Sequence, residues 1–253
     1  MKRFFTFLII NSVVLFLITN VKVFTQETES TGSSGIPINF GVKAGLTMSG
    51  FINEMKMTSE FTNSFIPGGI GGGYVEYPFN DKFSVQLEAY FSQFGGSYLM
   101  LEHEGRFGLN LPVDPKFIKN KVTLNNLYVP LLFKAQLPLD IGGNPVVYIG
   151  PDVSYNIYTQ LRQSYIGFDS GSNGVWTSNE RYEEVTELYE PLVYGATAGI
   201  GIELDTDFGL LLLDLRYHRS ITLTKEGYSY IDHNDIKENL WSHSFYFTLG
   251  YGF

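Results

Sequence analysis

Hydrophobic and polar side chains alternate along most of the chain from Asn39 onward, with a period of two residues. This period is that of a β-strand whose two faces meet different surroundings. The pattern divides into eight segments separated by turns and longer loops. The approximate ranges of the segments are 39–51, 68–79, 83–95, 122–138, 145–160, 188–204, 208–219 and 241–253.

The connections between these segments alternate in length. Those after the second, fourth and sixth segments are short, and the other four span about 52–67, 96–121, 161–187 and 220–240. An even number of antiparallel strands with short turns at one end and long loops at the other is typical of outer-membrane barrels. Each segment also reaches the roughly 9–11 residues that a tilted strand needs to cross a bilayer. The sequence therefore predicts an all-β fold, an eight-stranded antiparallel transmembrane β-barrel in an up-and-down meander.

Two other β folds fit the alternation less well. A soluble sandwich predicts shorter strands, and a lipocalin-type barrel points its apolar face inward. The face opposite the apolar one carries charges of both signs here, which favours a polar lumen and a lipid-facing apolar surface. The predicted lumen charges are Lys43, Glu76, Glu88, Lys134, Asp152, Glu203, Asp214 and Arg216.

These charges predict a packed network of ion pairs inside the barrel. Eight strands enclose a space just wide enough for side chains to fill, and unpaired buried charges are costly. Counted from the short turns, Lys43 is expected beside Glu76, and Glu88 beside Lys134. A narrow conduit or proton path through the lumen is the alternative.

The last twelve residues, SHSFYFTLGYGF, place five bulky apolar side chains on one face. Because unpaired backbone groups are costly in hydrocarbon, this segment is predicted to close the barrel on the segment 39–51. A terminal Phe after alternating aromatic residues also resembles the signal that the barrel-assembly machinery reads. The residues that carry this resemblance are Phe245, Phe247, Leu249, Tyr251 and Phe253.

Two prolines fall within predicted strands, at Pro130 and Pro151. Proline has no backbone N–H and so removes one hydrogen bond from the sheet. The sequence predicts a bulge or a local register break at each of them.

The chain begins with a pattern typical of exported proteins. Lys2 and Arg3 precede an apolar run from Phe4 to Ile18, which is shorter than the roughly 20 residues that span a bilayer. We therefore predict a signal peptide at 1–25, a disordered lead at 26–38 and the barrel domain at 39–253, with an uncleaved anchor helix as the alternative. The expected location is the outer membrane of a Gram-negative bacterium, with the termini and short turns in the periplasm.

Composition excludes several kinds of protein. The formal net charge of -9 argues against nucleic acid as a partner, because nucleic-acid binders present a basic face. The chain has no Cys, which excludes disulfides, thiolate metal sites and a lipid-anchored lipoprotein. No cofactor is predicted.

The third long loop contains the acidic stretch SNERYEEVTELYE, which is read most simply as a solvated extension of the strands. A sharper hypothesis is contact with a divalent cation, or with a protein or ligand partner of basic character, through Tyr182, Glu183, Glu184, Glu187 and Trp176. Catalysis by a loop histidine, His103 or His233, is a further alternative. The chain contains neither Gly-x-Ser-x-Gly nor His-Glu-x-x-His, so no enzyme activity is predicted.

Several strand motifs together resemble the PorT-like outer-membrane β-barrel family. They run from the first predicted strand to the last, in family order: FGVKAGLTMSGF, GGYVEYPFNDKFSVQLEAYFSQFGG, LNNLYVPLLFKA, YIGPDVSY, GIGIEL, LDLRYHRSITLT and FTLGYGF. The resemblance implies an exported barrel of about eight strands with no shared catalytic residues to carry over. One branch of that family serves protein secretion across the outer membrane.

From the residues and the resemblance together we expect a non-enzymatic outer-membrane barrel. Its interior would be a packed polar scaffold, and its outer wall would contact the lipid of the outer membrane. Its exposed loops would bind a protein or ligand. It could serve as an accessory to secretion or to envelope integrity. The alternatives are a small-solute channel or transporter and a membrane-embedded hydrolase.

Overall fold

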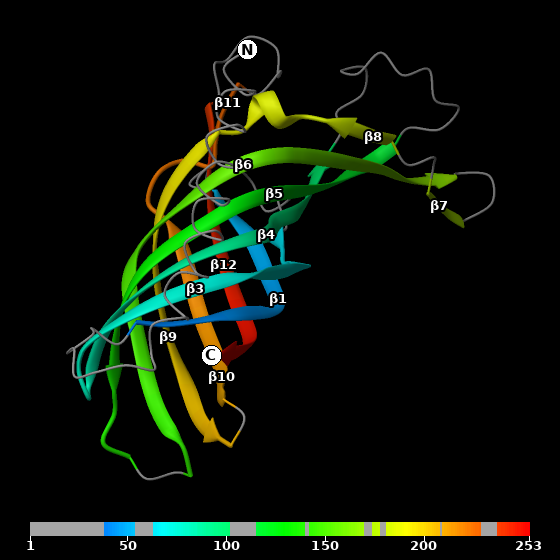
Figure 1. Cartoon of the computed structure of the whole chain (residues 1–253). Helices are drawn as coiled ribbons and strands as arrows, with labels where there is room; N and C mark the ends of the chain where they lie inside the picture. Colours follow the sequence, from blue (N-terminus) through cyan, green and yellow to red (C-terminus); the bar gives the residue numbers. More distant parts are fainter. Residues whose placement is uncertain are drawn as a thin grey trace. The chain divides into compact units, whose positions relative to one another are not determined.

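A computed structural model describes residues 38–53, 63–101, 115–139, 142–169, 174–177, 181–207, 209–228 and 237–253. Nearly all of these residues lie in β-strands (Figure 1). The predicted signal peptide, the predicted lead up to residue 37, His103 and His233 lie outside the described residues. In the ranges described, no helix has the length and apolar character needed to cross a membrane.

Eight long strands form a closed barrel, and each pairs antiparallel with the next along the chain. The last strand pairs with the first, from Gly41 opposite Gly252 to Asn53 opposite Leu240. The predicted eight-stranded meander and its closure are therefore confirmed. The strands are β1 (Asn39–Asn53), β3 (Ile66–Asn80), β4 (Phe83–Leu101), β5 (Pro115–Gln136), β6 (Asn144–Asp169), β9 (Leu192–Thr206), β10 (Gly209–Ser220) and β12 (Lys237–Gly252).

The outer wall is mostly apolar, and most of the polar side chains of the long strands point into the lumen. On β1, Leu46 is 66% exposed whereas its neighbour Thr47 is 1% exposed. On β12, Phe247 is 56% exposed whereas Thr248 is 3% exposed. This is the arrangement that a barrel needs in lipid, where the outer wall must be apolar.

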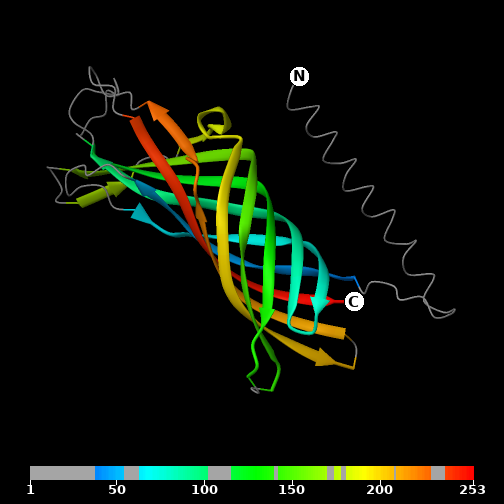
Figure 2. The same ribbon diagram turned by 90° about the vertical axis from the view of Figure 1, so that its left-hand side faces the viewer.

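Four short strands extend the sheet beyond the long-loop end of the barrel. They are β2 (Asn63–Ser64), β7 (Gly174–Thr177), β8 (Arg181–Glu184) and β11 (Lys225–Tyr228). Figure 2 shows the β3–β4 and β9–β10 turns at one end and the long extensions of β5 and β6 at the other. The expected loops 96–121 and 161–187 are thus partly strand. Sequence missed these extensions because apolar and polar residues no longer alternate regularly there, so the period-two signal disappears.

The two strand prolines interrupt pairing without shifting it. Between β4 and β5, pairing lapses opposite Pro130 and resumes in the same register. Between β5 and β6, it lapses at Pro151 and again resumes in register. The predicted bulge or register break at each proline is therefore wrong. The paired residues on either side hold the two strands together across the missing hydrogen bond, so no residue is displaced.

Candidate functional site

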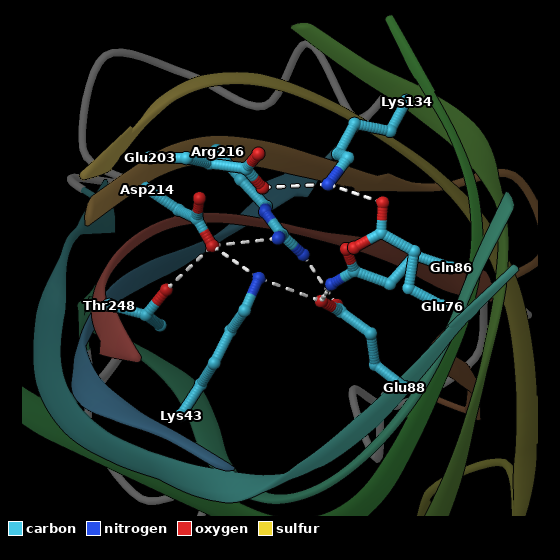
Figure 3. Close-up of polar contacts among 9 residues, drawn as sticks. All are labelled: Lys43, Glu76, Gln86, Glu88, Lys134, Glu203, Asp214, Arg216 and Thr248. Carbon is cyan, nitrogen blue, oxygen red and sulfur yellow. Dashed lines mark hydrogen bonds and ion pairs between the residues drawn. The ribbon is translucent and has the colours of Figure 1, made fainter. Parts of the chain in front are cut away.

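The most distinctive chemistry of the barrel lies in its lumen, where two groups of charged side chains meet (Figure 3). The first, which we call the central cluster, joins β1, β4 and β10. The second, the mouth cluster, lies close to the short turns. The central cluster comprises Lys43, Glu88, Asp214 and Arg216, and the mouth cluster comprises Glu76, Lys134 and Glu203.

In the central cluster each cation contacts both carboxylates. Lys43 Nζ lies 2.7 Å from Asp214 Oδ2 and 3.2 Å from Glu88 Oε1. The Arg216 guanidinium lies 2.7 Å from Asp214 Oδ2 and pairs with Glu88 through its other terminal nitrogen. The side chains of all four residues are at most 5% exposed. Two positive and two negative charges therefore balance in a buried space.

Neighbouring groups complete the central cluster. Gln86 Nε2 donates to Glu88 Oε1 at 2.5 Å, and Thr248 Oγ1 donates to Asp214 Oδ2 at 3.3 Å. The Arg216 guanidinium lies over the Tyr148 ring, 4.2 Å from its centroid. Such ring contacts and hydrogen bonds offset part of the desolvation cost of a buried charge.

The mouth cluster is not balanced in charge. Lys134 Nζ lies 2.5 Å from Glu76 Oε1 and 2.7 Å from Glu203 Oε1, so one ammonium serves two carboxylates. The second oxygen of Glu76, Oε2, is buried and has no hydrogen-bond partner among the described residues. The mouth cluster thus carries one formal negative charge in excess when both carboxylates are ionised.

The partners differ from those expected from sequence. Lys43 was expected beside Glu76, and Glu88 beside Lys134, whereas Lys43 contacts Glu88 and Lys134 contacts Glu76. The strands of a barrel tilt by about 35–45° against its axis. Equal counts of residues from the turns therefore do not give equal heights in the lumen.

The eighth predicted lumen charge, Asp152, lies in a third group that sequence reasoning missed. Its Oδ2 lies 3.0 Å from His218 Nδ1 and accepts a hydrogen bond from Thr197 Oγ1 at 2.8 Å. The Tyr128 hydroxyl lies 2.5 Å from the same Thr197 oxygen. His218 could have been found, because it follows Asp214 and Arg216 at two-residue spacing on the inward face of β10.

Aromatic rings fill the lumen at the level of His218. Phe94 stacks on the imidazole with a centroid distance of 5.8 Å, and Tyr128 and Tyr246 surround it at 5.6 and 6.3 Å. These rings belong to one buried apolar cluster that also contains Tyr90. Side chains therefore occupy the cross-section above the charged clusters.

A short segment of the third long connection packs against the buried side chains at the long-loop end of the lumen. This segment, Val185–Glu190, contains the 3-10 helix η1 (Thr186–Leu188) and is called the cap below. Val185 and Tyr189 are buried in the same apolar cluster as Phe51. The Val185 N–H donates to Thr159 O at 3.0 Å, and Thr159 N–H donates to Thr186 Oγ1 at 3.0 Å. Beneath the cap, a small cavity leaves room for about one water molecule.

The predicted loop residues do not gather into one site. Tyr182 lies under the Arg162 guanidinium, 5.5 Å away, and Glu183 forms an exposed ion pair with Arg181 at 3.5 Å. Glu184 Oε1 accepts a hydrogen bond from Thr186 at 3.2 Å, and Glu187 is exposed on η1. Trp176 lies in β7 opposite Gly167, and its side chain is outside the described residues.

Within the described residues, no group of three or more His, Cys, Asp or Glu is arranged to hold a metal ion.

The five apolar residues at the C-terminus lie on the outer wall of β12. Phe245, Phe247, Leu249 and Phe253 are each between 46% and 68% exposed. The Phe253 ring lies 5.7 Å from Phe40 on β1 and 5.2 Å from Tyr251. The last residue thus packs across the seam where the barrel closes.

The chain aligns with several solved structures of bacterial proteins. Ail of Yersinia pestis aligns over 85% of this chain and 99% of its own, with 10% identity and a TM-score of 0.35. OprG of Pseudomonas aeruginosa aligns over 85% and 95%, with 13% identity and a TM-score of 0.42. The protease OmpT of Escherichia coli aligns over 90% and 99%, with 10% identity and a TM-score of 0.33. No curated protein sequence matches the chain.

A family model for the outer membrane protein beta-barrel domain matches residues 24–226, which is most of the chain. The match agrees with the closed meander, the apolar outer wall and the charged lumen described above. The chain belongs to the outer membrane protein beta-barrel domain family, whose place is the outer membrane of Gram-negative bacteria.

Proposed function

We propose that the protein is a non-conducting, non-enzymatic outer-membrane barrel. Its lumen is a structural scaffold, and its external extensions bind a protein or ligand partner. The termini and short turns would then face the periplasm. The single observation that carries this proposal is the filling of the lumen. The central cluster, the aromatic layer around His218 and the cap follow one another from the short-turn end to the long-loop end.

A filled lumen has a direct electrical consequence. An ion crossing it would have to displace Arg216 or Lys43 from carboxylates that are themselves buried. Separating such pairs without replacing the partner costs about 3–5 kcal/mol each. Thermal motion of the native barrel should therefore not provide a steady ion path.

Single-channel recording in planar bilayers tests this proposal. The purified barrel is expected to insert without giving steady conductance steps in 1 M KCl. Insertion is verified separately by the folded band that a closed barrel keeps in cold SDS and loses on boiling. Reproducible conductance steps from inserted barrels would contradict the scaffold proposal.

The observation that favours a channel is a set of buried polar atoms without partners along the lumen wall. Asp152 Oδ1, Asp214 Oδ1 and Arg216 Nε are among them. Buried polar groups are normally hydrogen-bonded, so water threading between them is the most economical way to satisfy them. A narrow proton or water path is thus the second candidate, and an internal pH dye in liposomes would detect it.

The finer roles concern partners. We propose that the β12 residues Phe245, Phe247, Leu249, Tyr251 and Phe253 are read by the barrel-assembly machinery. The resemblance to the PorT-like family supports a role as an accessory to secretion or envelope integrity, with the cap and β8 as the contact surface. Co-purification from native outer membranes, with and without the segment 181–184, would identify such a partner.

A further inference from the structure

The cavity beneath the cap is lined mainly by polar side chains. They come from elements that are far apart in the chain, and three apolar side chains complete the wall. A ligand of about the size of a water molecule fits this space and would contact the cap and the barrel wall at once. The polar lining residues are Asn126 on β5, Ser154 and Asn156 on β6, Glu190 at the end of the cap, Thr224 just before β11, and Ser242 on β12.

Three of these side chains carry a buried oxygen that has no hydrogen-bond partner among the described residues. The three oxygens are Asn126 Oδ1, Ser154 Oγ and Thr224 Oγ1. Their residues are only 5%, 4% and 4% exposed. Buried polar atoms normally have a partner in the protein or in a bound group. Three such oxygens around one small cavity therefore indicate that a ligand completes their contacts.

The same cavity has one carboxylate, from Glu190. The Glu190 N–H donates to Thr224 O at 3.0 Å, and the Asn156 N–H donates to the carbonyl of the next residue, Pro191, at 2.9 Å. The backbone around the carboxylate is therefore tied to the rest of the barrel. No Lys, Arg or His is among the described residues that line the cavity, and the Lys225 ammonium lies over a ring of the cap, 5.7 Å from its centroid.

The donor atoms indicate which ligand the cavity suits. The three unpartnered atoms and the carboxylate are all oxygens, which are the ligands that Ca²⁺ and Mg²⁺ prefer, whereas Zn²⁺ favours imidazole and thiolate. Mg²⁺ demands a near-ideal octahedron, but Ca²⁺ tolerates irregular sets of oxygens. Side chains from four separate parts of the fold make an irregular set. A water molecule would satisfy the neutral oxygens equally well, but its binding would not depend on Glu190.

We propose that Asn126, Ser154, Thr224 and Glu190 bind a calcium ion that fastens the cap to the barrel. Because Glu190 is only partly buried, water can supply the remaining ligands from its side. With one carboxylate the affinity falls in the weak range of extracellular calcium modules, on the order of 10⁻⁴–10⁻³ M. The site goes beyond the scaffold function proposed above and does not depend on it.

Isothermal titration of CaCl₂ into the purified protein, in detergent and 150 mM KCl, tests the site. The variant E190Q is expected to bind Ca²⁺ at least tenfold more weakly than the native chain, and T224V, which removes one ligand oxygen, several-fold more weakly. The matched control is E187Q. It removes a carboxylate from the same short segment, at an exposed position that does not line the cavity, and should bind as the native chain does.

A second measurement reports whether the ion fastens the cap. A Glu-specific protease should cleave after the exposed Glu187, and mass spectrometry identifies the cut. In the native chain we expect this cleavage to be several-fold slower in 5 mM CaCl₂ than in EGTA. In E190Q the two rates should be equal. The folded band in cold SDS verifies that each variant still forms the closed barrel.

Four results would overturn the proposal. They are the absence of Ca²⁺ binding up to 10 mM, equal affinity of E190Q and the native chain, an equal loss in E187Q, and Mg²⁺ or Na⁺ binding as tightly as Ca²⁺. The first would leave water as the occupant of the cavity. None of these results bears on conductance through the lumen, so a failure of the calcium site is distinct from a failure of the scaffold proposal.

Discussion

At the scale of single residues, charges inside the barrel are stable only as sets. Desolvation penalises each buried ion by several kcal/mol, and the attraction to a partner recovers this only with close geometry and further hydrogen bonds. The central cluster meets both conditions, because Asp214 Oδ2 lies 2.7 Å from both Lys43 Nζ and an Arg216 nitrogen. Removal of one member should therefore lower the free energy of unfolding by far more than its own contacts contribute, because a partner is left buried and unpaired.

The substitution Lys43→Met tests this directly. It leaves Glu88 and Asp214 with Arg216 alone, so one carboxylate stays buried without full compensation. We expect the free energy of unfolding to fall by about 3–5 kcal/mol, measured by urea titration of the barrel in lipid vesicles.

The control is Lys82→Met, at an exposed position in the β3–β4 turn. It should change stability by less than about 0.5 kcal/mol. Adding Asp214→Asn to Lys43→Met leaves one cation, Arg216, with one carboxylate, Glu88. The double variant should therefore lose less free energy of unfolding than the sum of the losses in the two single variants. A Lys43→Met barrel as stable as Lys82→Met would show that the central cluster is hydrated and not a coupled set.

The sequence predicted which charged side chains point into the lumen, but not which residues they contact. Alternation along one strand is a local property, so the inward positions of Lys43 and Asp214 follow from their neighbours. Their contact joins residues 171 apart in the chain and depends on strand tilt, which no local pattern encodes. The inward position of His218 follows from the same alternation, but its contact with Asp152, 66 residues away in the chain, does not.

At the scale of strands, closure depends on how nearly β1 and β12 approach each other. A Cβ built on Gly45 would lie 2.0 Å from the Phe247 carbonyl oxygen, far inside van der Waals contact. On β3, by contrast, a Cβ on Gly69 would meet nothing within 4 Å. The two glycines are therefore predicted to differ in their tolerance of substitution.

Gly45→Ala should weaken the seam between the first and last strands, and Gly69→Ala should not. We expect a loss of about 1–3 kcal/mol or more for Gly45→Ala from overpacking, and a change near zero or slightly stabilising for Gly69→Ala. Urea unfolding followed by tryptophan fluorescence measures both. Equal stability of the two variants would mean that the strands at the seam separate readily to admit a methyl group.

Sequence predicted the eight membrane strands well and the external elements poorly. The membrane strands carry a strong signal because lipid on one side and a polar lumen on the other impose the alternation. β8 and η1 carry no such signal, and every residue of β8 is exposed. Val185 and Tyr189 of the cap are buried in a cluster that also contains Phe51, and the Tyr189 ring contacts Phe51 on β1, a strand far away in the chain.

At the scale of the whole barrel, the connections at the two ends differ in length. The short-turn end has tight connections such as the one containing Asp207, whereas the other end carries the cap, β8 and the extensions of β5 and β6. In outer-membrane barrels the short turns face the periplasm and the long loops face outside.

Because the chain contains no Cys, a single introduced thiol reports orientation without background. Asp207→Cys lies in the β9–β10 turn and Glu187→Cys lies on η1, and both replace an exposed acidic residue. A maleimide reagent that cannot cross the outer membrane should label Glu187→Cys in intact cells, and should label Asp207→Cys only after the membrane is permeabilised. The reverse pattern would place the long loops in the periplasm. The cap and β8 would then lie in the periplasm, and they could not contact a partner outside the cell.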